Sequence, residues 1–201
     1  MRIPFVLSTI LILVAADEEI SECLKKCILP LAKQERSFSH IFKNYDHVCD
    51  LLEDGAYCAR KCETEDQRKF HQYSTFYRII CIDYQEDLEP HLPCLSEAAK
   101  EIDAVCHDKC HGNKYAKEKI DGETDKQVEN CKAIECSTIC FYQEFVEDCP
   151  DAKDALLKLN IGQIHTIANS IHPLAFEKMG DECKRIHNTD YMKKKLNDFQ
   201  E

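Results

Sequence analysis

Glycine and proline are scarce in this 201-residue sequence, with five and six copies, and tryptophan is absent. Five glycines cannot build a glycine-rich phosphate-binding loop, and neither a G-x-G nor a G-K-S/T string occurs. Basic residues are also few, because 26 lysines and arginines face 37 aspartates and glutamates, for a formal charge of −11. Nucleic-acid binding needs a basic face that releases counterions from phosphate. The composition therefore argues against both nucleotide-loop enzymes and a nucleic-acid partner.

Long apolar runs are absent as well. The longest, Phe5 to Val14, spans about ten residues, half of what a bilayer core requires. Arg2 precedes this run, and small residues follow it up to Ala16, before the acidic Asp17. This order is typical of a secretory signal peptide, so we predict cleavage between Ala16 and Asp17. The sequence thus predicts a secreted, extracellular protein without a membrane span, with a signal peptide at 1–16, a disulfide-rich domain at 17–187 and a charged tail at 188–201.

Cysteine, by contrast, is abundant and even in number. A secreted chain with an even set of cysteines is expected to form a disulfide framework, here of seven bridges. About 10⁵ pairings are open to such a set, so the sequence does not assign them. The spacing differs from the paired C-x-x-C knuckles of a zinc ribbon, so we expect no metal and no cofactor. The fourteen disulfide candidates are Cys23, Cys27, Cys49, Cys58, Cys62, Cys81, Cys94, Cys106, Cys110, Cys131, Cys136, Cys140, Cys149 and Cys183.

Four C-x-x-x-C pairs stand out among these cysteines. Residues four apart lie on one face of a helix, so each pair presents two sulfur atoms along a single stripe. Two antiparallel helices with such stripes can be joined twice, outer cysteine to outer and inner to inner. The pairs begin at Cys23, Cys58, Cys106 and Cys136.

The cysteine order also repeats. Seven cysteines from Cys23 to Cys94 and seven from Cys106 to Cys183 follow the same order of doublets and singles. We interpret this as a duplicated unit, with sub-units at 20–95 and 100–187. Seven is odd, so full pairing then requires a bridge between the halves, for which we choose Cys94–Cys183.

Helical periodicity covers most of the remaining sequence. Apolar residues at three-and-four spacing predict one helix from Phe38 to near Gly55. A capping box at 64–67 predicts the start of another helix, which continues to Cys81. Further helices are expected from Pro93 to a stop at Gly112, from 128 to 145, and from 157 to 171, with a charged, solvated stretch at 113–130 and a frayed tail from 184. No β-alternation of useful length is present. The expected fold is all-α, a disulfide-rich bundle of stapled helical hairpins.

The densest chemical cluster is the run from Cys106 to His111. Its His-Asp-x-Cys core is similar to the catalytic string of secreted phospholipases A2, but the glycine-rich calcium loop of that family is missing. His107 and His111 also have the helical spacing of a zinc-protease pair, but Asp108 stands where a glutamate is required. We therefore favour a surface turn beside two disulfides and predict no catalytic residue.

Two other patterns have ordinary structural interpretations. His40 and His47, and likewise His165 and His172, are seven residues apart, and each pair is expected to lie half-exposed on one helical face. The apolar face of 157–171 is expected to pack as core. The alternative is that this face holds lipid against Ile161, Ile164 and Ile171.

The cysteine order and the residues around several cysteines resemble the chondroitin proteoglycan 4 domain of nematode secreted proteins, over about residues 20–185. The resemblance implies a nematode extracellular protein, some of whose relatives carry chondroitin chains. No glycine follows a serine here and no N-x-S/T sequon occurs, so the proteoglycan function does not transfer. The residues that carry the likeness are Phe42, Tyr45, Cys49, the Cys58 doublet, Tyr77-Arg78-Ile79-Ile80-Cys81, Pro93-Cys94-Leu95 and the Cys106 doublet.

From these observations we predict a secreted, non-enzymatic extracellular protein that acts as a matrix component or binding module. Its acidic surface favours a basic partner or matrix component. Two alternatives stay open: a secreted carrier of a small apolar ligand or lipid, and, third, a hydrolase that uses the His107 region.

Overall fold

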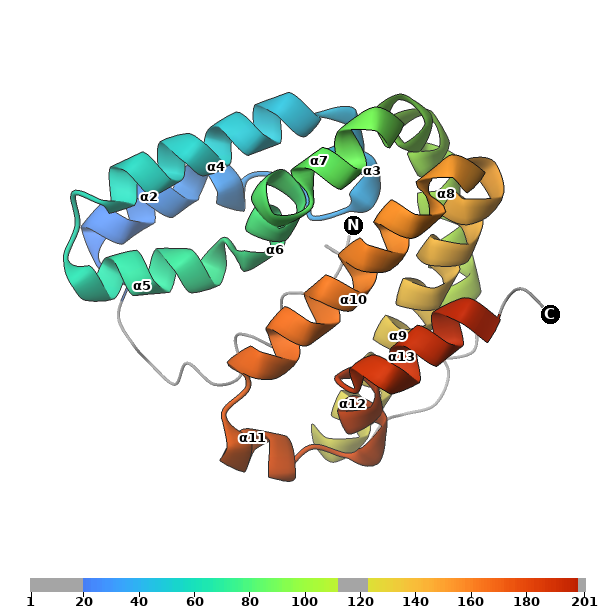
Figure 1. Ribbon diagram of the computed structural model, residues 1–201. Helices are drawn as coiled ribbons and strands as arrows, with labels where there is room; N and C mark the ends of the chain where they lie inside the picture. The colour runs from blue at the N-terminus through green and yellow to red at the C-terminus, as the bar shows by residue number, and fades with distance from the viewer. Residues whose placement is uncertain (1–19, 112–122, 199–201) are drawn as a thin grey trace. The chain divides into compact units, whose positions relative to one another are not determined.

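The computed structural model describes residues 20–111 and 123–198, and regular structure in these ranges is entirely helical. The predicted all-α class is confirmed. The chain divides into two compact units, with the boundary between Gln85 and Glu86, and each unit is described separately (Figure 1). The predicted signal peptide, 1–16, lies outside the described residues.

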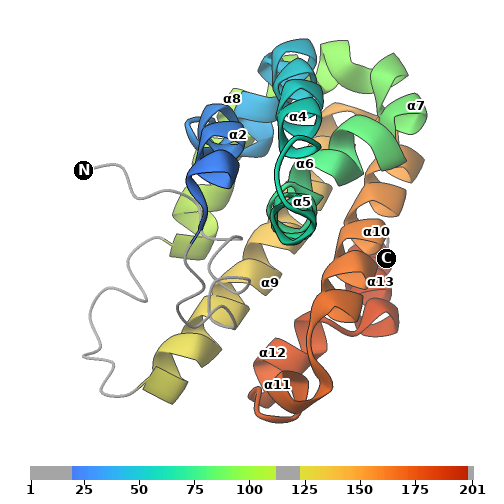
Figure 2. The same ribbon diagram turned by 90° about the vertical axis from the view of Figure 1, so that its left-hand side faces the viewer.

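Unit 1 is built on an antiparallel helical hairpin covered by a third helical segment. Helix α2 packs against α4, and α5 packs against both (Figures 1 and 2). Apolar side chains from these helices and from the segment after α5 fill the core, among them Leu24, Leu31, Leu52, Phe70 and Tyr77. The elements of unit 1 are α2 (Glu22–Ala32), α3 (Phe38–Lys43), α4 (Tyr45–Ala59), α5 (Thr64–Tyr73), α6 (Thr75–Arg78), the π-helix η1 (Ile79–Asp83) and the start of α7 (Gln85–Leu88).

Polar side chains fix these helices to one another. Ser21 Oγ caps α2 by accepting from the Leu24 N–H at 3.0 Å, and the same hydroxyl donates to the buried Asp66 carboxylate at 2.6 Å. The buried hydroxyl of Tyr45 donates to the Ile80 carbonyl at 3.1 Å, and that of Tyr77 to a carbonyl of α2 at 3.2 Å. Each bond joins segments far apart in sequence, so these groups specify how the helices are placed as well as satisfying their own polarity.

The predicted helix from Phe38 to near Gly55 begins at the right residue, but it is neither continuous nor ends at Gly55. It breaks at Asn44, whose side-chain amide donates to the His40 carbonyl at 2.8 Å and closes α3. It does not end at Gly55, because α4 continues to Ala59. Gly55 lies inside α4 and is buried because Phe70 packs directly against it. A Cβ atom at this position would lie only 2.8 Å from Phe70 Cζ.

The predicted helix from 64 to Cys81 is also divided. It is interrupted at Ser74 and then widens into the π-helix Ile79–Asp83, where the Tyr84 N–H bonds to the Ile79 carbonyl. The predicted capping box is not formed, because Glu63 is the N-cap and Gln67 instead donates to the Cys62 carbonyl at 3.0 Å. The wider turn lets three successive residues, Ile79, Ile80 and Cys81, be buried together.

Unit 2 repeats the hairpin with longer helices. Helices α8 and α9 form its two arms, and α10, α12 and α13 pack along α9. Its core contains Leu95, Ile102, Phe145, Leu159 and Met192. The elements are η2 (Glu89–His91), α8 (Leu92–His111), α9 (Glu123–Asp148), η3 (Pro150–Ala152), α10 (Lys153–Ser170), α11 (Pro173–Glu177), α12 (Asp181–Ile186) and α13 (Thr189–Asn197).

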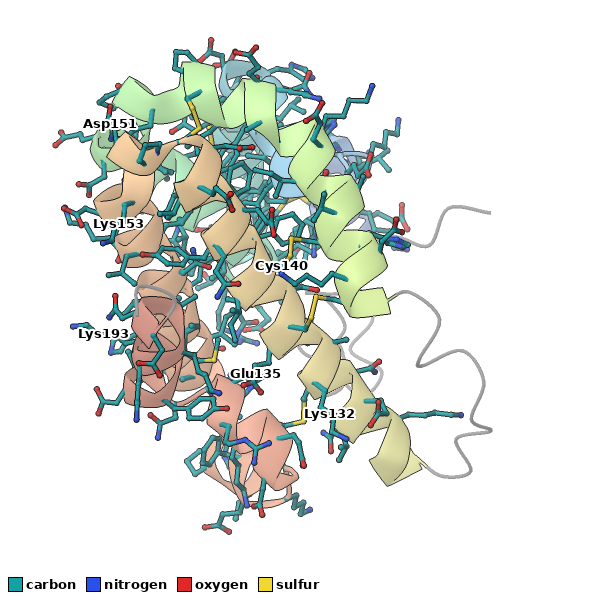
Figure 3. All side chains as sticks on the ribbon, turned by 90° about the vertical axis from the view of Figure 1, so that its right-hand side faces the viewer. Lys132, Glu135, Cys140, Asp151, Lys153 and Lys193 are labelled. Carbon is teal, nitrogen blue, oxygen red and sulfur yellow. A yellow bond between two sulfur atoms is a disulfide. The ribbon has the colours of Figure 1, made fainter. Side chains whose placement is uncertain are left out.

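All fourteen cysteines are paired, and the double staples have the expected order. In unit 1 the outer cysteines pair as Cys23–Cys62 and the inner ones as Cys27–Cys58. In unit 2 the outer pair is Cys106–Cys140, seen between α8 and α9 in Figure 3, and the inner pair is Cys110–Cys136. The remaining bridges are Cys49–Cys81, Cys94–Cys149 and Cys131–Cys183.

The predicted bridge Cys94–Cys183 is wrong. Cys94 lies in the first turn of α8 and is bonded to Cys149, directly after α9, because the start of α8 and the end of α9 lie together in the antiparallel hairpin. Cys183 pairs with Cys131 on α9. Cys131 precedes Cys149 by 18 residues, which is about 27 Å along a helix. The units therefore hold six and eight cysteines rather than seven each, and no bridge joins them.

The C-terminal residues are ordered where a frayed tail was expected. Residues 181–197 form α12 and α13, which bury Cys183, Ile186, Met192 and Leu196. Spacing of four between Met192 and Leu196 gives α13 an apolar stripe that packs against α10. The predicted stop at Gly112 and most of the predicted solvated stretch lie outside the described residues.

Candidate functional site

A groove of about 620 Å³ opens on the surface of unit 1. Helix α4 forms one wall, and residues of α5, α6 and η1 form the other. The residues of the first wall run from Leu52 on α4 to Arg60, the residue that caps the end of this helix, so the wall is about 12 Å long at the rise of an α-helix. This volume lies in the range of small-molecule binding sites.

Local features of the sequence shape the groove. The glycine at position 55 lets α5 approach α4 closely, so that Phe70 is buried in the floor beside Leu52 and Ala59. The break at Ser74 then turns the chain, and the π-helix that follows brings Ile82 to the groove. The helices are close together at position 55, and the chain changes direction at Ser74. Together these two features leave a concave surface between the two walls.

The floor is apolar but the walls are cationic and aromatic. Arg60 and Arg78 line the groove together with His71, Gln67 and a single carboxylate, that of Glu53. At its edge the ring of Tyr57 is 63% exposed, and the Lys61 ammonium lies 4.2 Å from the centre of that ring.

One contact defines the electrostatics of the groove. The Arg78 guanidinium Nη1 lies 2.6 Å from His71 Nε2, and because arginine can only donate, the imidazole accepts and is neutral. Burial lowers the pKa of His71, and the nearby Arg78 charge lowers it further, against a smaller opposing effect of Asp83. The groove therefore contains two positive charges and one negative charge at neutral pH.

The catalytic cluster considered from the sequence is exposed. His107 lies on the outer surface of α8, with its Nδ1 atom 3.5 Å from the carboxylate of Asp108. The flanking cysteines are buried and disulfide-bonded. His111 also belongs to α8, but its side chain lies outside the described ones.

The two histidine pairs predicted to share a helical face are separated in the structure. His40 and His47 do not share a helix, because the chain breaks between them at Asn44, and His40 bonds to Gln34 at 2.9 Å. His165 is exposed on α10, whereas His172 precedes α11 and caps it by accepting from the Leu174 N–H. The structure therefore does not place either pair on one helical face.

The apolar face predicted at 157–171 is displaced around α10. Of the three isoleucines that the carrier hypothesis uses, Ile164 is buried, Ile161 is half-buried, and Ile171 lies after the end of the helix. The buried face instead carries Leu156, Leu159 and two polar residues, Asn160 and Gln163.

Three sulfur atoms, those of Cys23, Cys27 and Cys62, lie within 4.8 Å of one another. All three belong to disulfides, so none provides the thiolate that a metal ion binds. Among the described residues this cluster is part of the framework.

The groove itself was missed by the sequence analysis. The sequence analysis did not consider Tyr57, Arg60 or His71 as parts of a site. Arg78 appeared only within the segment before Cys81. No spacing rule connects these positions, because two separate helices and a π-helical turn bring them together.

Comparison with known proteins agrees with the resemblance seen in the sequence. The family model for chondroitin proteoglycan 4 matches residues 13–185, while no curated protein and no solved structure matches the chain. Seven disulfides and this family match fit an extracellular protein, and no helix in the described ranges is long and apolar enough to cross a membrane. Because the match covers most of its length, the chain belongs to the chondroitin proteoglycan 4 family.

Proposed function

We propose that the protein is a secreted, non-enzymatic extracellular protein, a matrix component or binding module that binds its ligand in the groove of unit 1. The observation that carries this proposal is a groove of about 620 Å³ whose α4 wall is fixed by disulfides. Cys58 lies between Tyr57 and Ala59 of that wall and is bonded to α2. A wall held in this way loses little conformational entropy when a ligand binds.

If the protein is instead a carrier of a small apolar ligand, the groove of unit 1 is again the binding site that we propose. The floor of Leu52, Ala59 and Phe70 gives an apolar ligand a surface to cover. This observation favours the groove of unit 1 over the α10 face, where only Ile164 of the three isoleucines is buried.

The proposal is tested with a neutral apolar fluorophore, N-phenyl-1-naphthylamine, whose emission rises on binding. We expect saturable binding at one site per chain. Ala56→Phe fills the groove from α4 and is expected to abolish binding, whereas Asp54→Phe, an exposed position on α4 that does not line the groove, is expected to leave it unchanged.

Two results contradict the proposal. The first is an absence of saturable binding by both this neutral probe and a charged amphiphile. The second is hydrolytic turnover by the purified protein that disappears in a His107→Ala variant, which assigns the function to α8 instead.

A further inference from the structure

We infer that the groove of unit 1 is selective for a small organic anion, a carboxylate with an apolar body, whose head group binds Arg78. This inference rests on the proposed function, because it names the ligand class of the same groove. It depends on three features of the groove: unpaired cationic groups, a preoriented guanidinium and an apolar floor.

The first feature is the pairing of charges. The chain has eleven more acidic than basic residues, and some basic side chains form ion pairs, as Lys25 does with Glu22 and Lys158 with Asp87. Within the described residues Arg60 and Arg78 form no ion pair, although both line the groove. The groove is therefore a cationic site on an acidic protein, and an anion is the ligand that such a site attracts.

The second feature is the orientation of Arg78. Its guanidinium is half-buried and donates one hydrogen bond to a neutral imidazole, that of His71. A carboxylate at this position would neutralise the arginine, but the imidazole orients it and leaves its charge and its other N–H donors available. A planar, preoriented guanidinium binds both oxygens of a carboxylate, which a lysine ammonium does not match.

The third feature explains why the anion needs an apolar body. Beside the arginines, the floor consists of buried Phe70 and Leu52, and the exposed side chains Tyr57 and Ile82 stand at the edge. Ile82 is 58% exposed, a large apolar surface in contact with solvent. A bare inorganic anion covers none of this surface, whereas an amphiphile covers it while its head group meets Arg78.

Glu53 provides a check of opposite sign. It is the one carboxylate in the lining and repels an anionic head group. Removing its charge is therefore expected to strengthen binding of an anion, and removing that of Arg78 to weaken it. Neither change is expected to alter the affinity for an uncharged ligand.

The test compares octanoate with octan-1-ol, which share an apolar chain and differ in the charge of the head group. Each displaces N-phenyl-1-naphthylamine from the full-length, disulfide-intact protein. Since hydrogen bonds between charged groups are stronger than those of a neutral hydroxyl, we expect octanoate to act at a concentration at least about tenfold lower. Arg78→Gln should remove this preference and Glu53→Gln should increase it, whereas Arg68→Gln, on α5 but outside the groove lining, should leave it unchanged.

Each outcome has a distinct meaning. Equal displacement by octanoate and octan-1-ol overturns the anion inference and leaves the binding function intact. Failure of every probe to bind overturns the proposed function itself. If Arg78→Gln does not fold, the exposed Glu53→Gln variant still decides, because unchanged octanoate affinity in that variant contradicts the inference. An acidic peptide that displaces the probe better than octanoate would assign the groove to a protein partner and overturn the inference.

Discussion

The two units share one disulfide topology and differ in how they finish their cores. The repeating set of cysteines begins at Cys23 in unit 1 and at Cys106 in unit 2. In each set the first cysteine pairs with the fifth, the second with the fourth, and the third with a cysteine on a later element. These third bridges are Cys49–Cys81 and Cys131–Cys183, with sequence separations of 32 and 52 residues. Unit 2 adds Cys94–Cys149, which closes the end of its longer hairpin.

The difference lies in the polar groups of the cores. In unit 1 the buried hydroxyls of Tyr45 and Tyr77 both donate to backbone carbonyls. In unit 2 the Tyr142 hydroxyl, Gln163 Nε2 and His187 Nε2 are buried with no hydrogen-bond partner among the described residues. A buried unpaired polar group costs about 1–3 kcal/mol. The comparison shows that the same disulfide order does not lead to the same hydrogen bonding of buried polar groups.

Removal of the third bridge from each unit should have the largest effect on stability. In the chain-entropy picture, bridges of 32 and 52 residues stabilise by about 4 kcal/mol each, with the longer one ahead by a few tenths. We expect the C49A/C81A variant to weaken hydrogen-exchange protection in unit 1 and the C131A/C183A variant to weaken it in unit 2. Hydrogen-exchange mass spectrometry under increasing urea reports each unit separately.

If removal of either bridge lowers hydrogen-exchange protection equally in both units, the expected separation of the two effects is contradicted. The expectation of separate effects rests on the bridges themselves, because all seven join residues within a single unit.

The next effect in size comes from a matched pair of glycines. Gly55→Ala in unit 1 places a Cβ atom 2.8 Å from Phe70 Cζ and 3.2 Å from the Cys27 carbonyl oxygen, and Cys27 is held by a disulfide. We expect a loss of about 1–3 kcal/mol from overpacking, despite the higher helix propensity of alanine. Gly180→Ala in unit 2 meets Val128 at 3.4 Å, an ordinary contact, and should change stability by less than about 0.5 kcal/mol.

Thermal unfolding of the two variants measures this difference. Equal losses at positions 55 and 180 would mean that Phe70 yields easily, and the close approach of α5 to α4 would then not be what shapes the groove.

The smallest expected effect is a difference in acid sensitivity. Burial lowers the pKa of His187 in unit 2 below its usual value of 6.5. The folded state then binds fewer protons than the unfolded state, so unit 2 loses stability as the pH falls below about 6.5 and through the lower folded pKa. His187→Gln removes this dependence and should flatten the loss of unit 2 stability between pH 7 and pH 5.

Unit 1 supplies the control for this experiment. The pKa of His71 is also lowered, but its side chain is exposed in the groove, so His71→Gln should flatten the acid dependence less. Urea midpoints at several pH values, read for each unit by hydrogen exchange, measure both changes. An acid loss that is unchanged by His187→Gln contradicts the role given to this histidine.

The repeat of cysteine spacings was informative but was divided at the wrong place. Because C-x-x-x-C is a helical spacing, the sequence predicted two doubly stapled hairpins, and both were found. Counting seven cysteines per half placed Cys94 in the first unit, yet it starts α8 of the second. Spacing along the chain reports which residues share a helix face and says nothing of which helix ends meet.

Helix boundaries were predicted less well than helix faces. The apolar three-and-four spacing over 38–55 includes positions that are buried, among them Ile41, Phe42, Val48 and Leu52, but it did not predict the break at Asn44. That break depends on a side-chain amide that closes α3, and the continuation through Gly55 depends on Phe70 from another helix. The local sequence pattern therefore predicts which positions of a helix are buried, whereas the ends of the helices depend on individual side-chain contacts.

By itself, the sequence determined the all-α class, the helical staples and the family, because each is encoded in residue spacing along one chain. Tertiary structure alone decided the pairing of Cys94 and Cys183, the packing of α13, and the groove. The groove brings Arg60 at the end of α4, His71 of α5 and Arg78 of α6 to one surface. The physical reason is that a site between helices depends on their relative placement, which is set by close contacts such as that of Gly55 with Phe70 and not by the periodicity of any one helix.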